Sequence, residues 1–124
     1  MLKFYICSHC GKIVSEVKPG APISCCGEPM QLLEAGVVEA SAEKHVPVAT
    51  VENGLVRVNV GSVNHPMSEE HLIEWVALET DRGYLLQYLS ATDAPEVVFA
   101  LAENQKAVAV YAYCNLHGLW KAAL

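Results

Sequence analysis

The stretch His45–Val60 has the sequence HVPVATVENGLVRVNV, in which two valine-rich runs flank Asn53-Gly54. We expect a strand over 45–51 and another over 55–60, because β-branched residues favour extended backbone. The Asn-Gly pair predicts a tight hairpin between them, since both residue types tolerate a positive φ. In the second run valines alternate with polar residues, which indicates a strand with one buried face. The valines are Val56, Val58 and Val60, and the polar residues are Arg57 and Asn59.

Four further runs continue this pattern towards the C-terminus, at 73–79, 83–89, 97–102 and 107–113. Short segments containing Gly, Asp, Asn or Pro separate the runs, and no long helical period lies between them. Short strands at this spacing are typical of an antiparallel sandwich. We therefore predict an all-β fold in which residues 37–124 form an antiparallel β-sandwich.

The first 36 residues have a different character. Glycine and proline recur throughout this segment, which leaves room only for short strands and turns. Its apolar content is small, and chains below roughly 40 residues usually need a metal or disulfides to fold. The sequence therefore predicts a small metal-binding domain over 1–36, followed by the sandwich domain over 37–124.

The composition limits the classes of partner. The 124 residues carry a net charge of −6, which argues against nucleic acid, whose phosphates favour an excess of Lys and Arg. The same charge repels a small anionic substrate, so such a substrate would need a local positive patch. No apolar run is long enough for a bilayer, and the N-terminus shows no signal-peptide pattern. We expect a cytoplasmic protein with no membrane partner and with reduced cysteines.

Four of the five cysteines lie within the first 26 residues, as Cys7-Ser8-His9-Cys10 and Cys25-Cys26. An odd count in a cytoplasmic chain is a poor disulfide framework. Two cysteine pairs on either side of a Gly/Pro-rich loop predict a tetrahedral four-sulfur site for iron or zinc, distorted because Cys25 and Cys26 are neighbours. His9 is interpreted as a loop residue. The spacing leaves a structural zinc knuckle, an electron-transfer iron and a vicinal disulfide open, and it favours a metal over the disulfide.

The remaining cysteine and four histidines form a second candidate set, near predicted strand ends: His45, His65, His71, Cys114 and His117. Taken singly, each histidine is more typical of a surface or capping residue, and Cys114 of a small buried hydrophobe. These side chains divide into an early group of four thiolates and a late His₄Cys group, and this division favours a second metal site. Five ligands are more than structural zinc and blue copper sites take. The set fits an iron with four imidazoles in one plane, an axial thiolate and an open sixth position.

Taken together, the motifs resemble the desulfoferrodoxin family of two-iron superoxide reductases over essentially the full length of the chain. The resemblance rests on Cys7-Ser8-His9-Cys10, Cys25-Cys26-Gly27-Glu28-Pro29-Met30, Glu43-Lys44-His45-Val46-Pro47, His65-Pro66-Met67, His71-Leu72-Ile73-Glu74-Trp75 and Cys114-Asn115-Leu116-His117-Gly118. It implies a desulforedoxin-like N-terminal part with iron on Cys7, Cys10, Cys25 and Cys26. It also implies an immunoglobulin-like sandwich whose catalytic iron takes four equatorial histidines and axial Cys114. Asn64 departs from the proline of many relatives.

The resemblance further implies one-electron reduction of superoxide to hydrogen peroxide. Lys44 would attract the anion, and Glu43 would occupy the sixth position of ferric iron and help displace peroxide. On the residues alone, the pair is better explained as a solvated surface couple. A homodimer and a rubredoxin-like electron donor are also implied. A rubredoxin-like electron carrier and a structural zinc-binding protein are the alternative functions.

Overall fold

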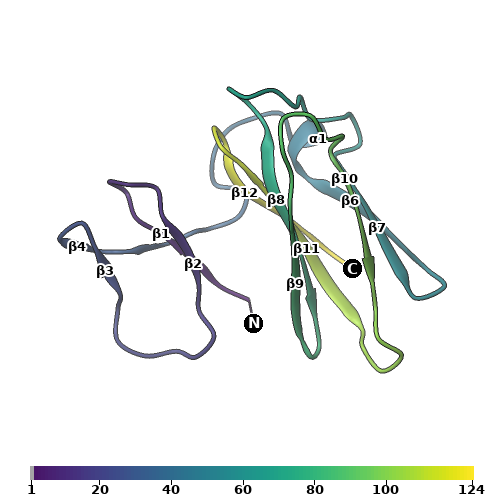
Figure 1. Ribbon diagram of the computed structural model, residues 1–124, viewed down its shortest axis with the longest axis horizontal. Helices are drawn as coiled ribbons and strands as arrows, with labels where there is room; N and C mark the ends of the chain where they lie inside the picture. Colours follow the sequence, from purple (N-terminus) through teal and green to yellow (C-terminus); the bar gives the residue numbers. More distant parts are fainter. Residues whose placement is uncertain (1) are drawn as a thin grey trace. The chain divides into compact units, whose positions relative to one another are not determined.

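The computed structural model describes residues 2–124, and it is almost entirely antiparallel β-structure, as predicted. The chain divides into two compact units, Met1–Glu34 and Ala35–Leu124 (Figure 1). This division falls two residues before the boundary expected from the sequence. That each part folds as a separate domain stays a prediction. Among residues 2–124, no helix has the length and apolar character that crossing a membrane requires.

The first unit contains five short strands and little core. They are β1 (Phe4–Ile6), β2 (Ile13–Ser15), β3 (Ser24–Cys25), β4 (Glu28–Pro29) and β5 (Gln31–Leu32). One sheet has the order β2-β1-β5, and β3 pairs with β4 as a separate hairpin. Among residues 2–34, the buried apolar side chains are Phe4, Cys7 and Met30. A core of this size supports the expectation that the unit depends on a metal.

The second unit is the predicted sandwich of two antiparallel sheets (Figure 1). One sheet has the order β10-β7-β6, with β6 at Pro47–Glu52, β7 at Leu55–Val60 and β10 at Glu96–Ala100. The other has the order β12-β11-β8-β9, with β8 at Ile73–Thr80, β9 at Gly83–Tyr88, β11 at Ala107–Cys114 and β12 at Gly118–Ala123. One short helix, α1 (Ala42–His45), precedes β6. Helix α1 and the turn between β11 and β12 lie at the same end of the unit (Figure 1).

The hairpin predicted from Asn53-Gly54 is confirmed. Glu52 pairs with Leu55, so the two residues between them form the whole turn. Their φ angles are 52° and 75°, and positive φ at both central positions defines a type I′ turn. The valine alternation is confirmed too, since Val56, Val58 and Val60 are all buried.

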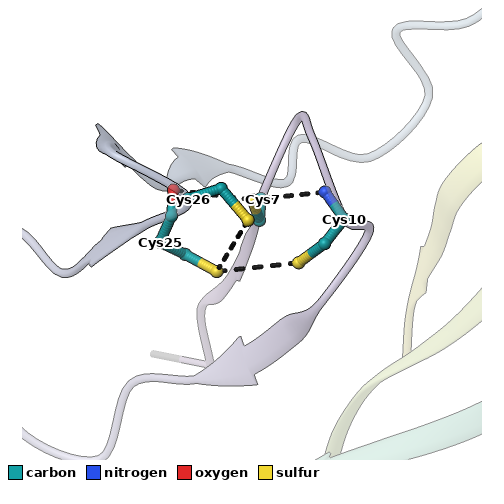
Figure 2. A group of neighbouring side chains, drawn as sticks. All are labelled: Cys7, Cys10, Cys25 and Cys26. Atoms are coloured by element: carbon teal, nitrogen blue, oxygen red, sulfur yellow. Dashed lines mark hydrogen bonds between the residues drawn. The ribbon is translucent and has the colours of Figure 1, made fainter.

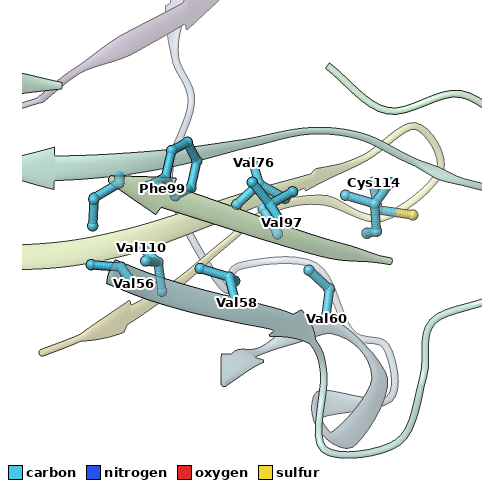
Figure 3. Packing of buried hydrophobic residues seen from close by; sticks show 11 residues of the cluster. Val56, Val58, Val60, Val76, Val97, Phe99, Val110 and Cys114 are labelled. Carbon is cyan, nitrogen blue, oxygen red and sulfur yellow. The ribbon is translucent and has the colours of Figure 1, made fainter. Parts of the chain in front are cut away.

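The core of the sandwich comes from residues of both sheets, and Cys114 belongs to it (Figure 3). Val56, Val58 and Val60 lie in a row on β7, opposite residues of the other sheet such as Val76 and Val110. Figure 3 shows Cys114 at one end of this row, with its sulfur pointing away from the labelled valines. The end of the core therefore presents a thiol to the end of the sandwich where α1 lies.

Two details differ from the sequence expectation. His45 does not open a strand: it is the last residue of α1, and β6 begins at Pro47. The last strand, β12, was not predicted, although it pairs with β11 over six residues. A four-residue helix shows no periodicity, and β12 is recognisable only through its pairing with β11, which periodicity does not reveal.

Candidate metal centres

The first cysteine pair lies on a turn that leaves β1. The Cys7 N–H donates to the Lys12 carbonyl at 2.9 Å, and the Gly11 N–H donates to the Cys7 carbonyl at 3.0 Å. The Cys10 N–H points at the Cys7 sulfur, 3.5 Å away. These bonds close the Cys-x-x-Cys turn and direct both sulfurs to one side, as the spacing predicted.

The second pair lies on the hairpin of β3 and β4. Cys25 pairs with Glu28, so Cys26 and Gly27 are the two central turn residues. Both have positive φ, 54° and 80°, which again defines a type I′ turn. The left-handed backbone of Cys26 turns its side chain towards that of Cys25, and their sulfurs lie 3.9 Å apart. This conformation lets neighbouring cysteines serve one site.

The four sulfurs form a compact group with the dimensions of a metal site (Figure 2). All lie within 4.8 Å of one another, and Cys10 and Cys25 are 3.6 Å apart. With metal–sulfur bonds of about 2.3 Å, the edge of a regular tetrahedron is about 3.8 Å. The two measured sulfur–sulfur distances, 3.6 and 3.9 Å, lie on either side of this value. All four cysteines are free thiols, so the vicinal disulfide is not formed.

The environment of the thiols also favours a cation. Backbone N–H groups of Cys10 and His9 lower the pKa of Cys7 to about 6. Close contact with the sulfurs of Cys7 and Cys10 raises the pKa of Cys25. Four thiolates at this distance repel one another, and a bound metal ion removes that cost. The four residues therefore fit a metal ion that is bound by four cysteine sulfurs.

At the end of the sandwich, four imidazoles surround one point. Neighbouring rings around this circle have centroids 4.6 to 5.1 Å apart, in the order His45, His65, His71, His117 and back to His45. Neighbours are close to perpendicular, with interplanar angles of 79° to 84°. Across the circle, the centroids of His45 and His71 are 6.4 Å apart. The tertiary structure therefore brings together histidines that are as much as 72 residues apart.

Hydrogen bonds orient two of these rings for metal binding. The Nδ1 atom of His45 lies 2.8 Å from the Ser41 carbonyl, and Nδ1 of His65 lies 2.7 Å from the Pro66 carbonyl. A carbonyl accepts only, so each Nδ1 carries the proton and each Nε2 presents a lone pair. The two Nε2 atoms face each other at 3.2 Å. Two facing lone pairs repel, and a cation between them relieves the repulsion.

Cys114 and His117 complete the cluster. The ligand atoms of His45, His65, His71 and Cys114 all lie within 4.8 Å of one another. The Nδ1 atom of His117 lies 3.1 Å from His45 Nε2 and 3.8 Å from the Cys114 sulfur. The Nε2 atom of His71 is buried without a hydrogen-bond partner among the described residues. An unpartnered buried nitrogen is costly, and a metal ion would satisfy it.

Burial sets the protonation of this site. It lowers the pKa of His65 to about 4, and it is also the main cause of the lowered pKa values of His45 and His71. Burial raises the pKa of the Cys114 thiol, while the N–H groups of Leu116 and His117 oppose this. His45, His65 and His71 are therefore neutral at pH 7, which is the form that binds metals. The thiol needs a nearby cation to ionise.

Glu43 and Lys44 lie on α1, directly before His45, and both side chains are exposed. Neither forms an ion pair within the described part of the chain. After burial, the Lys44 charge is among the smaller causes that lower the pKa values of His45 and His71. The structure thus brings a positive charge near the histidine cluster.

Several residues that shape the site escaped the sequence expectation. The carbonyls of Ser41 and Pro66 orient two rings, but a backbone acceptor leaves no signal in the sequence. The Trp120 ring lies 4.9 Å from the His45 ring, and its N–H donates to the His117 carbonyl at 3.1 Å. For Trp120, the only sequence feature that links it to the site is its position in Leu119-Trp120, directly after the Cys-x-x-His-Gly motif.

Comparisons with known proteins cover both units. Residues 37–123 match the family model described as desulfoferrodoxin, and residues 1–33 match the desulfoferrodoxin N-terminal domain. The chain is 44% identical over 121 residues to desulfoferrodoxin from Nitratidesulfovibrio vulgaris, covering 97% of this chain and 94% of the relative. It is 46% identical over 120 residues to desulfoferrodoxin from Syntrophotalea carbinolica, with 96% and 94% covered.

The crystal structure of the superoxide reductase from Treponema pallidum is similar over 98% of both chains, with a TM-score of 0.83 and 38% identity. The match extends over both units of this chain. The resemblance inferred from the motifs is confirmed. The chain belongs to the desulfoferrodoxin family, with one iron centre expected at each cluster.

Proposed function

We propose that His45, His65, His71, His117 and Cys114 hold the catalytic iron of this superoxide reductase, and that Cys7, Cys10, Cys25 and Cys26 hold the other. The observation that carries the catalytic assignment is the convergence of three imidazole nitrogens and one sulfur within 4.8 Å. His117 joins them through Nδ1, 3.1 Å from His45 Nε2. Five protein donors would leave one position of a six-coordinate iron for the substrate.

When bound, the iron supplies one electron and a Lewis-acid site for superoxide. The overall reaction adds one electron and two protons to superoxide and yields hydrogen peroxide. His45, His65 and Cys114 are buried, whereas His71 and His117 are half-buried. The imidazoles would hold the metal without cancelling its charge, and the Cys114 sulfur would donate electron density to it.

Lys44 and Glu43 would act on the substrate and product. The Lys44 ammonium attracts the superoxide anion to a chain whose net charge of −6 repels it. Its Nζ would be available as a hydrogen-bond donor to the substrate, because Lys44 forms no ion pair among the described residues. Glu43 carries a carboxylate on the same exposed helix, and its role would be to help displace the product. The position of both residues directly before His45, and the lack of an ion pair to either side chain among the described residues, support this assignment over a surface couple.

The reaction is tested by its stoichiometry. With iron loaded and an electron donor in excess, reduction yields one hydrogen peroxide for each superoxide consumed and no oxygen. Dismutation yields one peroxide and one oxygen for every two superoxides. A ratio near one half with oxygen release would contradict the reductase function.

The residue assignment is tested by two variants. Cys114→Ala should abolish peroxide formation and leave the absorption spectrum of the four-cysteine iron unchanged. Lys44→Ala should slow the reaction with superoxide about tenfold at low salt, within the range of electrostatic steering. Lys106→Ala is the matched control, because Lys106 is exposed before the opposite end of β11 and carries the same charge. An equal loss in both lysine variants would reject a local role for Lys44.

Two alternative functions remain distinguishable. A pure electron carrier would retain its electron-transfer rate in Cys114→Ala. A structural zinc protein would show no visible absorption that bleaches with a reductant. The electron donor is proposed to be a rubredoxin-like protein, tested by the rate at which reduced rubredoxin restores the ferrous enzyme. Turnover with such a donor would serve to remove superoxide from the cell.

We also propose a homodimer in the cytoplasm. The first unit exposes Val17 at 92% and Ile23 at 54%, and both line a hollow of about 580 Å³, which a second copy could cover. All five cysteines are free, as a reducing compartment requires. Sedimentation of the native protein and of Val17→Glu tests the dimer. A native mass equal to one chain would contradict it.

A further inference from the structure

His71 differs from His45 and His65 in how its ring is held. Carbonyl groups fix the Nδ1 atoms of His45 and His65. Among residues 2–124, no comparable bond is seen for His71, and its buried Nε2 has no partner. The orientation of this ring therefore depends on the backbone that carries it, which is the loop before β8.

The side chain of Asn115 holds that loop on both sides of His71. Its Oδ1 accepts a hydrogen bond from the Leu72 N–H at 3.0 Å, and its Nδ2 donates to the Glu70 carbonyl at 2.9 Å. The Asn115 backbone N–H also donates to the Leu72 carbonyl, at 3.2 Å. One residue therefore contacts both chain neighbours of His71.

These bonds replace sheet pairing that stops at this point. The pairing of β11 with β8 shifts register between Tyr113 and Cys114, where the ladder becomes irregular. Asn115 comes next in the chain and lies beyond the last pair, Cys114 with Ile73. Because the regular ladder ends here, the side-chain amide of Asn115 continues the connection between the two segments.

Ser68 closes the other side of the loop. The His71 N–H donates to its Oγ at 3.2 Å, and the Ser68 N–H donates to the His71 carbonyl at 2.9 Å. The loop from 68 to 72 is thus closed on itself through Ser68. Its connection to the strand that carries Cys114 is through Asn115. Asn115 follows Cys114 directly, so it links the loop of one proposed histidine ligand to the proposed sulfur ligand.

We propose that Asn115 is a positioning residue that sets His71 relative to Cys114 at the catalytic iron. This inference rests on the proposed function, because it takes both residues as ligands of one iron. Loss of the Asn115 amide leaves His71 on a loop that can move away from the metal. The alternative is that Asn115 stabilises the fold in general and positions no metal ligand.

The test uses iron-loaded full-length protein with the substitution Asn115→Leu, which keeps the approximate size and removes both side-chain bonds. We expect iron(II) affinity at the histidine site, measured by chelator competition, to fall about 10- to 100-fold, as for other residues that orient ligands. The absorption band of the ferric histidine site should shift. The spectrum of the four-cysteine iron is an internal control and should stay unchanged.

Asn104→Leu is the matched control, because Asn104 is exposed in the turn before β11 and makes no side-chain hydrogen bond in the described structure. Asn115→Asp should give a smaller effect than Asn115→Leu, because it retains the acceptor for Leu72 and loses the donor for Glu70. If both Asn115 variants lose the β-sandwich, the residue has a general structural role and the proposal is overturned.

A double-mutant cycle separates positioning from general stability. If Asn115 acts through His71, Asn115→Leu should add little to the loss of iron affinity already caused by His71→Ala. Full additivity would overturn the proposal, as would native iron affinity and spectrum in Asn115→Leu. Absence of a second iron from the wild-type protein would instead contradict the proposed function on which this inference rests.

Discussion

The four sulfurs of the N-terminal cluster come from residues 7–26, whereas the five side chains of the second cluster come from residues 45–117. The first cluster uses two local turns, and each turn presents two cysteines. The second uses α1, the loops before β8 and the turn after β11, which meet only in the folded sandwich. Local chain geometry builds one site, and long-range packing builds the other.

The two clusters also differ in the core that supports them. Among residues 2–34 the buried apolar side chains are Phe4, Cys7 and Met30, one of which is itself a sulfur donor. The sandwich has a continuous core from both sheets, in which Leu78 and Val110 are fully buried. From this difference we expect the metal to organise the first unit, whereas the sandwich is expected to organise its own metal site.

The largest expected effect comes from removing each metal separately. Cys10→Ala should unfold residues 2–34, because metal binding to small sites of this kind contributes on the order of 10 kcal/mol. Cys114→Ala should empty the second site and leave the sandwich folded. Residue-resolved hydrogen exchange measures whether each unit remains folded in each variant. Protection of residues 2–34 in metal-free protein would contradict the proposed difference between the two units.

Shortening a core side chain of the sandwich should destabilise that unit and leave the first unit unaffected. Leu78→Ala removes a fully buried side chain, and it should lower the free energy of unfolding of the sandwich by about 2–5 kcal/mol. The four-cysteine absorption should persist, since its ligands lie in the other unit. Urea unfolding followed by the fluorescence of Trp75 and Trp120 reports on the sandwich. Leu124→Ala, at a half-exposed position, is the control with a small expected effect.

Gly61 lies in a loop that packs against α1, so its substitution tests how far the histidine site depends on the position of that helix. A Cβ on Gly61 would lie 2.7 Å from the carbonyl oxygens of both Glu43 and Val46, so Gly61→Ala must displace α1. We expect a destabilisation of about 1–3 kcal/mol and weaker iron binding at the histidine site. Gly20→Ala is the control, because a Cβ there meets no atom within 4 Å. Native iron affinity in Gly61→Ala would show that α1 has room to adjust.

The smallest expected effect is a pH dependence of the iron-free sandwich. The pKa of His65 is about 4 in the folded chain, against an ordinary value of 6.5. Between these values the unfolded chain binds a proton that folded His65 does not, so the free energy of unfolding falls as pH falls. We expect a loss of about 1–2 kcal/mol from pH 7 to pH 5, measured by urea unfolding. His65→Gln should flatten the profile, and an unchanged slope would reject His65 as the cause.

Much of the fold was predictable because its signals are local. The type I′ turn at Asn53-Gly54 and the alternating valines of β7 depend on residue types a few positions apart. Helix α1 and strand β12 were missed, because a four-residue helix shows no period and β12 is defined by pairing with β11. The bonds of Asn115 to the loop of His71 were also beyond sequence reasoning, since they join segments 45 residues apart.

By itself, the sequence determined which side chains can bind metal, how they divide into two groups, and that most of the chain forms antiparallel strands. Residue type and short spacing carry this information, because thiol chemistry, turn preference and side-chain alternation are local properties. Only the tertiary structure decided that four imidazoles surround one point and that Cys114 ends the core beside them. Convergence of distant residues depends on the packing of the two sheets, which no local pattern specifies.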